Sequence, residues 1–348
     1  MNFRVRWLKH ALPATVALLL GILLSTCQAT PTPPPTATPA ISPSPSPMPS
    51  PTLPPLGQSG NPIVFGFILP NGEPSSRPEI NEIVTALTNQ TGYQVQAEIF
   101  PNEAELLESM RTGRTHLAFL QPLPYLYASE QRIADIALLS NHFGVYFYGT
   151  QFMANIESGF VAYYDPNTDQ SSADAATALQ QLSGKRPCWI ENASISGYLL
   201  PASLLASNNI PFPKGVLTLS PTASVRALYI KGICDYAATF AISGDPRTSP
   251  AILNDLPDAR ERIIVLWRSD AIIPNLGLAV HPALPAQIRA DLIDTMQQIA
   301  RNNTGKAVLS RALDYDIQDL RIVDDSIYDP IRQALQALSL NPQDFIGH

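Results

Sequence analysis

The segment Ile190-Glu191-Asn192-Ala193-Ser194-Ile195-Ser196-Gly197-Tyr198 is a polar turn between a predicted buried strand, residues 186–191, and a predicted helix, residues 197–207. Pro201 is compatible with this helix, because a proline in the first turn gives up an N–H that has no partner there anyway. A strand that passes through a tight turn directly into a helix is a building unit of α/β folds. The stretch therefore indicates an α/β domain.

The same alternation of strand and helix patterns extends to both sides of this junction. Towards the N-terminus the patterns predict strands at 63–68, 94–100 and 116–120, with helices at 79–89 and 103–112 between them. Towards the C-terminus they predict a strand at 160–164, a helix at 173–182, strands at 216–219 and 233–239 around a helix at 223–230, strands at 262–267 and 277–280, and helices at 285–301 and 327–338. The order βαβαβ at the start of this body predicts parallel strands.

The turn at 192–196 has the composition of an anion site. A helix N-terminus carries unpaired backbone N–H groups and a partial positive charge, so it can hold an anion without Lys or Arg. The hydroxyls of Ser194 and Ser196 are further donors, and Gly197 lets a ligand approach the backbone. The residues alone leave an equal alternative, in which Ser194 or Ser196 only caps the helix.

Composition divides the chain into two unlike parts. Of its 348 residues 34 are Pro, and twelve of these fall between residues 28 and 60, while the first 60 residues contain no Asp or Glu. Residues 61–348 carry 19 basic and 29 acidic side chains, a formal charge of −10. This acidic body argues against nucleic acid as a partner, because phosphate binding needs clusters of Lys and Arg.

The N-terminal part predicts export and a tether. Residues 1–27 have a basic start and an apolar run too short to span a bilayer, as in a signal peptide. The run Leu24-Ser25-Thr26-Cys27 resembles a bacterial lipobox, with Thr26 where a smaller residue is usual, so we expect Cys27 to be lipidated; cleavage after Ala29 or an uncleaved anchor is the alternative. Residues 28–60, rich in Pro, Thr and Ser, predict a disordered spacer.

Two further features leave alternatives open. Tyr125 follows a predicted strand end, where it can offer a hydroxyl to a ligand or, more commonly, pack in the core. Cys188 and Cys234 begin two strands that can be neighbours, and they are equally compatible with a disulfide or with two buried thiols. His116, His142 and His281 show no metal-ligand spacing, so we expect no metal site.

Sequence signatures of catalysis are absent. The chain contains no G-x-S-x-G elbow, no phosphate-binding G-x-x-x-x-G-K-[ST] loop, no G-x-G-x-x-G turn and no H-E-x-x-H helix. We therefore expect a protein that is not an enzyme and needs no cofactor.

Five motifs follow one another along the chain. They are Leu117-Ala118-Phe119-Leu120-Gln121-Pro122; Ser196-Gly197-Tyr198-Leu199-Leu200-Pro201; Ala223-Ser224-Val225 with Cys234-Asp235-Tyr236-Ala237-Ala238-Thr239; Ile273-Pro274-Asn275; and Tyr328-Asp329-Pro330-Ile331-Arg332. In this order they resemble the motifs of one family, the phosphate/phosphite/phosphonate-binding (PhnD-like) proteins of ABC importers, whose turn reads S-G-Y-x-x-P. Together the similarities cover most of residues 61–338.

The resemblance implies a type II periplasmic-binding fold, with a ligand held in a cleft between two α/β lobes that close by a hinge motion. It implies crossovers near 152–159 and 269–275, so that residues 61–152 and 272–348 form lobe 1 and residues 153–271 form lobe 2. It also implies ligand contacts from Ser194, Ile195, Ser196, Gly197, Tyr125, Thr222 and Asn275.

Departures from the family pattern restrict the ligand. Ile195 replaces a Thr between the two serines, and Gln121 replaces a loop Gly. Aminoalkylphosphonate binders carry acidic groups where this chain has Pro221-Thr222 and Leu276. Because a buried ligand ammonium needs a counter-charge, an oxyanion that is compact or has an uncharged tail fits better.

The expected function is therefore that of an extracytoplasmic, membrane-anchored solute-binding protein, monomeric, that captures a small oxyanion of the phosphonate, phosphite or phosphate class for an ABC permease and its ATPase. Two alternatives remain on the same fold: a ligand-sensing subunit of a signalling system, and a binder of a ligand without phosphorus.

Overall fold

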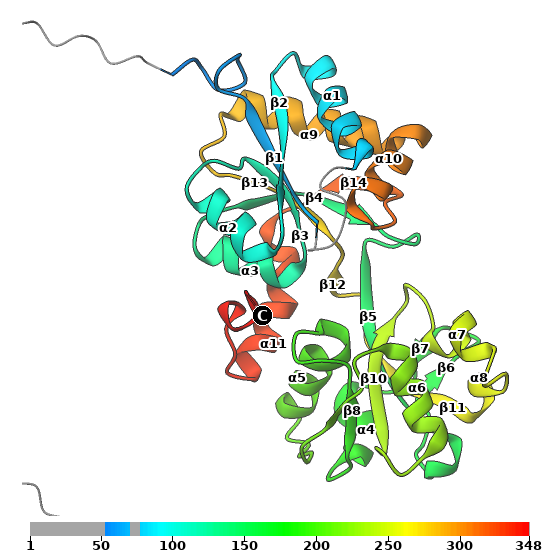
Figure 1. Cartoon of the computed structure of the whole chain (residues 1–348). Helices are drawn as coiled ribbons and strands as arrows, with labels where there is room; N and C mark the ends of the chain where they lie inside the picture. Colours follow the sequence, from blue (N-terminus) through cyan, green and yellow to red (C-terminus); the bar gives the residue numbers. More distant parts are fainter. Residues whose placement is uncertain (1–52, 70–76, 348) are drawn as a thin grey trace, which may run out of the picture. The chain divides into compact units, whose positions relative to one another are not determined.

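The computed structural model describes residues 53–69 and 77–347, and two mixed β-sheets organise them (Figure 1). The first sheet has the strand order β14 (Asp319–Ile322), β4 (Asp135–Asn141), β13 (Gly277–Val280), β3 (Leu117–Leu120), β1 (Ile63–Ile68) and β2 (Val95–Phe100). Strands β1, β2 and β3 pair in parallel, as the alternation of strands and helices predicts, and β13 returns antiparallel between β3 and β4.

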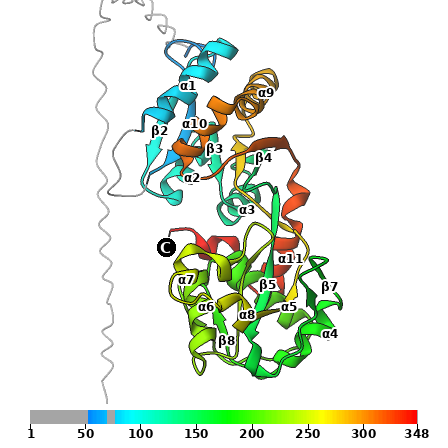
Figure 2. The ribbon, with the colours of Figure 1, turned by 90° about the vertical axis from the view of Figure 1, so that its right-hand side faces the viewer.

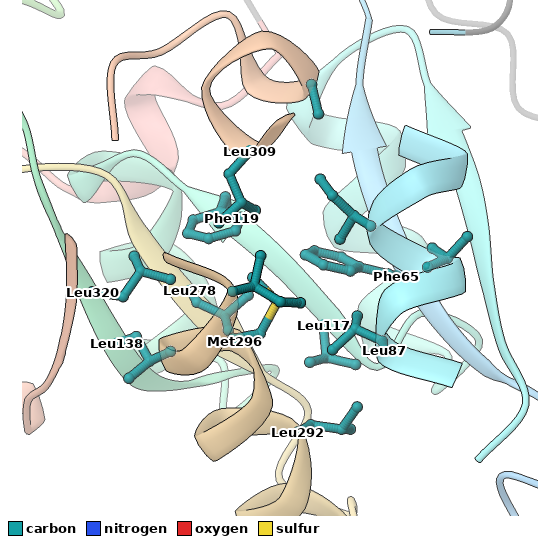
Figure 3. Packing of buried hydrophobic residues seen from close by; sticks show 14 of the residues in the cluster. Phe65, Leu87, Leu117, Phe119, Leu138, Leu278, Leu292, Met296, Leu309 and Leu320 are labelled. Atoms are coloured by element: carbon teal, nitrogen blue, oxygen red, sulfur yellow. The ribbon is translucent and has the colours of Figure 1, made fainter. Parts of the chain in front are cut away.

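One face of the first sheet is covered by α1 (Pro78–Thr91), α9 (Ala286–Arg301) and α10 (Asn303–Leu313) (Figures 1 and 3). Phe65 and Leu117 from the strands pack in one cluster with Leu87 from α1 and Met296 from α9 (Figure 3). Each such side chain contributes about 1.5–3 kcal/mol when it is fully buried. The apolar spacing in α1 predicted this buried face, and Gly92 ends the helix with φ +76°, a conformation that favours glycine.

The other face of the first sheet packs against α2 (Glu103–Arg111), α3 (Pro122–Glu130) and α11 (Asp329–Ala337). Helix α11 also contacts α5 (Leu200–Ser207), which belongs with the second sheet, and the two lie side by side in Figures 1 and 2. This apolar cluster therefore includes residues associated with both sheets.

The second sheet has the strand order β11 (Ile263–Arg268), β5 (Phe147–Asn155), β10 (Tyr236–Ala241), β8 (Pro187–Trp189) and β9 (Val216–Leu217), with β12 (Ile273–Pro274) paired to β5. Strands β8, β9 and β10 are parallel, and β5 runs antiparallel to β10 and β11. The accompanying helices are α4 (Ala175–Leu179), α6 (Pro221–Ile230), α7 (Pro250–Leu253) and α8 (Ala259–Arg262), and β6 (Tyr164–Asp165) pairs with β7 (Gln170–Ser171).

Two segments cross between the sheets and are hydrogen-bonded to each other. The first, residues 142–146, leads into β5, and the second, residues 269–275, contains β12. The amide of Asn275 donates to the Tyr146 carbonyl at 3.2 Å, and the amide of Ile272 donates to the Tyr148 carbonyl at 3.0 Å. Residues 147–155, which include the start of the first crossover that the resemblance implied, form a strand of the second sheet.

The folded body also begins earlier than the composition suggests. The carbonyl of Pro54 accepts a hydrogen bond from the Asn61 side chain at 2.8 Å, and the carbonyl of Gly57 accepts one from the Gln94 amide at 2.7 Å. Leu56 packs against the core of the first sheet. The expected spacer over 28–60 is therefore wrong at its end, because residues 54–60 form a turn that a proline-rich composition conceals. The signal peptide and the rest of the spacer lie outside the described residues.

Several elements differ from the sequence prediction. The expected strand at 160–164 is mostly loop, with β6 starting at Tyr164. Helices α3 and α10 and strands β4, β5 and β14 were not predicted. In α3 two prolines and adjacent aromatic residues hide the helical spacing, and α10 starts only two residues after α9, where the side chain of Asn302 caps it by accepting from the Thr304 amide at 2.9 Å.

A disulfide joins Cys188 and Cys234, which decides between the two alternatives that the sequence left open. It links β8 to the segment that precedes β10. Strands β8 and β10 are parallel neighbours in the second sheet. Within the described residues, no helix has the length and apolar character needed to cross a membrane.

Candidate functional site: a cavity at the strand ends

A cavity of about 750 Å³ opens beside the carboxyl ends of β3 and β8. Gln121 follows β3, and Ile190 follows β8; both side chains line it. The two crossovers contribute His142 and Asn275, and Tyr148 of β5 also lines the cavity. In open α/β sheets ligands bind at the carboxyl ends of strands, so this position is the expected one for a ligand site.

A second cavity, of about 650 Å³, lies elsewhere along the second crossover, where Arg268 and Asp169 line it. The arginine of this second cavity is already paired, because Arg268 forms an ion pair with Asp169 and stacks at 4.3 Å on the ring of Tyr164. The further carboxylates of Asp174 and Asp270 in the wall disfavour an anion. The larger cavity has unpaired donors and is the better candidate.

The turn after β8 brings its donors to the larger cavity. Residues Ile195–Leu199 form one turn of π-helix that continues into α5, and Ser194 is its N-cap residue. As the first residues of a helix, Ile195 and Ser196 have amide groups without intrahelical acceptors. A single wider turn of this type is frequent at functional sites.

The two serines of this turn differ in their environments. The Ser194 hydroxyl accepts a hydrogen bond from the Gly197 amide at 3.1 Å, so it caps the helix. The Ser196 side chain is 8% exposed, lines the cavity, and makes no hydrogen bond through its hydroxyl within the described residues. Its backbone carbonyl accepts a hydrogen bond from the Thr150 hydroxyl at 2.7 Å. Ser196 therefore has the unused donor, while Ser194 holds the shape of the turn.

Gly197 and Ile195 support the turn from behind. A Cβ atom on Gly197 would lie 2.2 Å from Cγ1 of Ile190, so only glycine allows the turn to pack this closely. The Ile195 side chain is buried in the apolar cluster that also contains Ile273 and Ile331. Ile195 can therefore offer a ligand its backbone amide but not its side chain.

Tyr125 lies in α3, away from the lining of the cavity. Its side chain is 1% exposed, and its hydroxyl donates to Asp325 at 2.6 Å and accepts from the Ile136 amide at 3.3 Å. Its ring centroid lies 4.4 Å from that of Tyr328. The structure thus places Tyr125 in the core, which is the other alternative that its position in the sequence allowed.

Asn275 lines the cavity and Thr222 does not. Asn275 is 3% exposed; its amide nitrogen donates to the Val145 carbonyl at 2.8 Å, and its oxygen accepts from the Tyr315 hydroxyl at 3.1 Å. Asn275 therefore fixes the positions of neighbouring groups of the wall. Thr222 lies in the first turn of α6, where its hydroxyl pairs with that of Ser220, and its neighbour Pro221 reaches the cavity instead.

The charge of the cavity wall is close to zero. None of the described lining residues is Lys or Arg, and Asp245 is the one carboxylate among them. Asp245 is neutralised by the buried Arg247, whose guanidinium donates to it at 2.7 Å. Burial raises the pKa of Tyr315 to about 12 and also raises the pKa of Tyr148, so both phenols keep their protons at neutral pH. Charge in a ligand must therefore be met by backbone amides and hydroxyls.

Comparison with known proteins identifies the family. Residues 65–328 match the family model of periplasmic phosphonate-binding proteins of ABC transporters. The chain belongs to this family. It is therefore an extracytoplasmic substrate-binding protein that works with a permease and an ATPase, and not an enzyme. No curated protein matches the chain.

Solved structures of low sequence identity share the family's type II periplasmic-binding fold. XAC2383 from Xanthomonas citri, solved with bound ATP, is 16% identical, with a TM-score of 0.59 over 80% of this chain and 98% of the other. PhnD1 from Prochlorococcus marinus (MIT 9301), solved with methylphosphonate, is 14% identical, with a TM-score of 0.50 over 80% and 98%. These matches support the fold that the resemblance implied.

The sequence did not point to the aromatic part of the cavity wall, which includes His142, Phe143, Tyr148, Phe240 and Tyr315. Gly144 is compatible with a two-residue hairpin turn, but the phenylalanine before it is not a residue typical of such a turn, so the sequence contained no signal of it. Tyr315 had no signal either, since its position depends on α10, which was not predicted.

Proposed function

We propose that the protein binds a small oxyanion of the phosphonate, phosphite or phosphate class at the turn Ser194–Gly197. The observation that carries this proposal is the Ser196 hydroxyl, which lines the cavity beside the first amides of a helix and has no hydrogen-bond partner among the described residues. Hydrogen bonds to a charged group contribute about 1.5–3 kcal/mol each, so two amides and one or two hydroxyls suffice for a specific site.

The proposed ligand carries no ammonium group on its tail. The absence of an unpaired carboxylate from the described wall supports this, because Asp245 is already paired with Arg247. A buried ligand cation without a counter-charge would lose more hydration energy than it gains.

We further propose two lobes, one on each sheet, with residues 142–146 and 269–275 as the hinge. The pairing between these segments supports a common axis of motion, since both chains must bend together. Lobe 1 would comprise residues 54–141 and 276–347, and lobe 2 residues 147–268. Lipidation of Cys27, with the following proline-rich segment as a linker, would hold the monomeric folded domain near the permease.

Titration calorimetry tests the ligand class. The purified chain is titrated with phosphate, phosphite, methylphosphonate, 2-aminoethylphosphonate and sulfate, and each titration is repeated with Ser196→Ala and Ser194→Ala. We expect binding of at least one of the first three, weak or no binding of the aminoalkyl compound, and a loss of about 1.5 kcal/mol or more in Ser196→Ala. Absence of heat with every compound contradicts the ligand class but not the fold.

Mass spectrometry of the membrane-associated protein tests the anchor. A diacylglyceryl mass on Cys27, lost in Cys27→Ser together with membrane association, is the expected result. A mature protein that begins after Ala29 contradicts it.

A further inference from the structure

We infer that the natural ligand joins its oxyanion to an uncharged, planar aromatic group, which packs against the aromatic residues of the cavity wall. This inference rests on the proposed function, because it takes the turn Ser194–Gly197 as the site of the oxyanion. It concerns the part of the cavity that an oxyanion bound at this turn would not fill.

The size of the cavity is the first reason. A volume of about 750 Å³ lies well within the range of roughly 300–1,000 Å³ that holds ligands much larger than a bare oxyanion. The space beyond Ser196 extends towards the first crossover and the segment after α10, where His142 and Tyr315 line it.

The composition of the wall is the second reason. Four of the sixteen described lining residues are Phe or Tyr, whereas Phe, Tyr and Trp make up only 8% of the chain. His142 adds a fifth ring: its centroid lies 4.0 Å from that of Tyr315, with an angle of 18° between the ring planes, and 4.1 Å from that of Phe143. A ligand ring can extend such a stack, and pairs of aromatic rings contribute about 0.5–1.5 kcal/mol beyond the area that they bury.

The backbone of Phe143 is the third reason. The amide of His142 donates to the Val145 carbonyl at 2.8 Å, and the Val145 amide returns a bond of 3.1 Å, so Phe143 and Gly144 form a two-residue turn. Both have positive φ, +47° and +90°, as a type I′ turn requires. Asn, Asp or Gly adopts this conformation readily, whereas a bulky residue there is strained.

The strained phenylalanine is also exposed. Phe143 is 62% exposed although it lines the cavity, and its amide is held by the Asp316 carboxylate at 3.1 Å. An apolar ring that is presented to solvent at a cost in backbone energy has no role in the core. A binding partner that covers the Phe143 ring explains both its exposure and its strained backbone. Because the ring borders the cavity, a ligand in the cavity is in the position to cover it.

Charge restricts the ligand group to a neutral one. A second anionic group would find no Lys or Arg among the described lining residues, and an ammonium would find Asp245 already bonded by Arg247. Nδ1 of His142 lies 2.8 Å from the Asp316 carbonyl and donates the hydrogen bond between them, and an imidazole ring supplies no negative charge to balance an ammonium.

The experiment compares phosphonates that share one head group. Methyl-, phenyl- and cyclohexylphosphonate and 2-(trimethylammonio)ethylphosphonate are titrated into the intact protein. We expect phenylphosphonate to bind at least tenfold more tightly than each of the others. Cyclohexylphosphonate is the matched control, because it has a similar size and apolar character but no aromatic face.

The variant Phe143→Asn separates the ring from the turn, because Asn keeps the positive φ at low cost. It should abolish at least half of the tenfold preference for phenylphosphonate over methylphosphonate, and keep or raise the melting temperature. Ile230→Ala, an exposed apolar residue at the end of α6, should change nothing.

The outcomes are distinct. If methylphosphonate binds as tightly as phenylphosphonate, the inference is overturned and the proposed function stands. Equal affinity for the cyclohexyl and phenyl compounds, or strongest binding of the trimethylammonio compound, also overturns it. If no phosphonate binds, the inference fails, and the proposed function fails with it only when phosphate and phosphite also give no heat.

Discussion

The hydroxyl of Thr150 donates a 2.7 Å hydrogen bond to the backbone carbonyl of Ser196. Thr150 lies on β5, directly after the first crossover, and its own amide donates to the Ser269 hydroxyl of the second crossover at 3.0 Å. Thr150, which is fully buried, therefore connects the second crossover to the turn that we propose holds the oxyanion.

Thr150→Val should weaken ligand binding and stability together. Valine keeps the shape of the side chain but leaves the Ser196 carbonyl without this donor, which costs about 1–3 kcal/mol when the group is buried. Calorimetry with the best ligand and urea unfolding measure the two effects. Thr150→Ser, which keeps the hydroxyl, is the control; if the Val and Ser variants behave alike, the hydrogen bond has no role in binding.

Gly197→Ala should disrupt the turn more than strain alone would. The added Cβ would lie 2.2 Å from Cγ1 and 2.7 Å from Cβ of Ile190, and a β-branched side chain cannot move both atoms away. We expect a loss of at least about 2 kcal/mol in stability, by overpacking, and no measurable ligand binding. Gly184→Ala is the control, since its Cβ meets open space and only its φ of +71° is unfavourable, at about 1 kcal/mol. Similar losses in the two variants would contradict the close packing at Gly197.

Reduction of the Cys188–Cys234 disulfide should destabilise the second sheet. The two cysteines are 46 residues apart, and closing a loop of that length stabilises a fold by about 3–4 kcal/mol in the chain-entropy description. Urea unfolding with and without dithiothreitol measures this loss. The double variant Cys188→Ala, Cys234→Ala should show the lower stability in both conditions, and a remaining response to dithiothreitol would assign the effect to another thiol.

His116 should make the protein less stable as the pH falls from 6.5 towards 4. Burial lowers the pKa of His116 to about 4, with a further contribution from His281, and its Nδ1 accepts a hydrogen bond from the Val64 amide at 3.0 Å. The unfolded chain, with a pKa of about 6.5, binds the proton first, so stability is fully present above pH 6.5 and declines below it. Because part of the ring reaches solvent, we expect a loss on the order of 2 kcal/mol.

His116→Asn tests the assignment to His116. Asn can accept the Val64 hydrogen bond through its side-chain oxygen but has no proton to take up in this range. Thermal melts between pH 4 and 7 should show a flatter pH dependence in this variant, and an unchanged slope would assign the effect to another group.

The sequence and the structure agree best where a feature depends on local chemistry. The buried face of α1, the βαβαβ unit and the polar turn after β8 follow from spacing, caps and glycine positions, which are properties of short segments. The strand Phe147–Asn155 gave no clear signal, because both of its faces are buried while Thr150, Gln151 and Asn155 interrupt its apolar residues, so no local pattern indicates which sheet it joins.

Side chains of the site were harder to predict, because their roles depend on contacts with distant residues or on the direction of a single backbone amide. The resemblance implied Tyr125, yet α3 turns this residue inward to Asp325, a contact across 200 residues that no local pattern shows. Ser196 and Ser194 look equivalent in the sequence, and only the direction of the Gly197 amide separates the cap from the open hydroxyl.

The disulfide ties the ability to bind a ligand to export of the protein. It fixes the start of β8, and β8 leads directly into the turn at Ser194, so the geometry of the turn depends on a covalent bond that forms only in an oxidising compartment. A precursor that has not yet been exported from the reducing cytoplasm would lack this bond. We therefore expect that the protein acquires its full capacity to hold a ligand only after export, which keeps cytoplasmic precursors from sequestering the nutrient that the importer delivers.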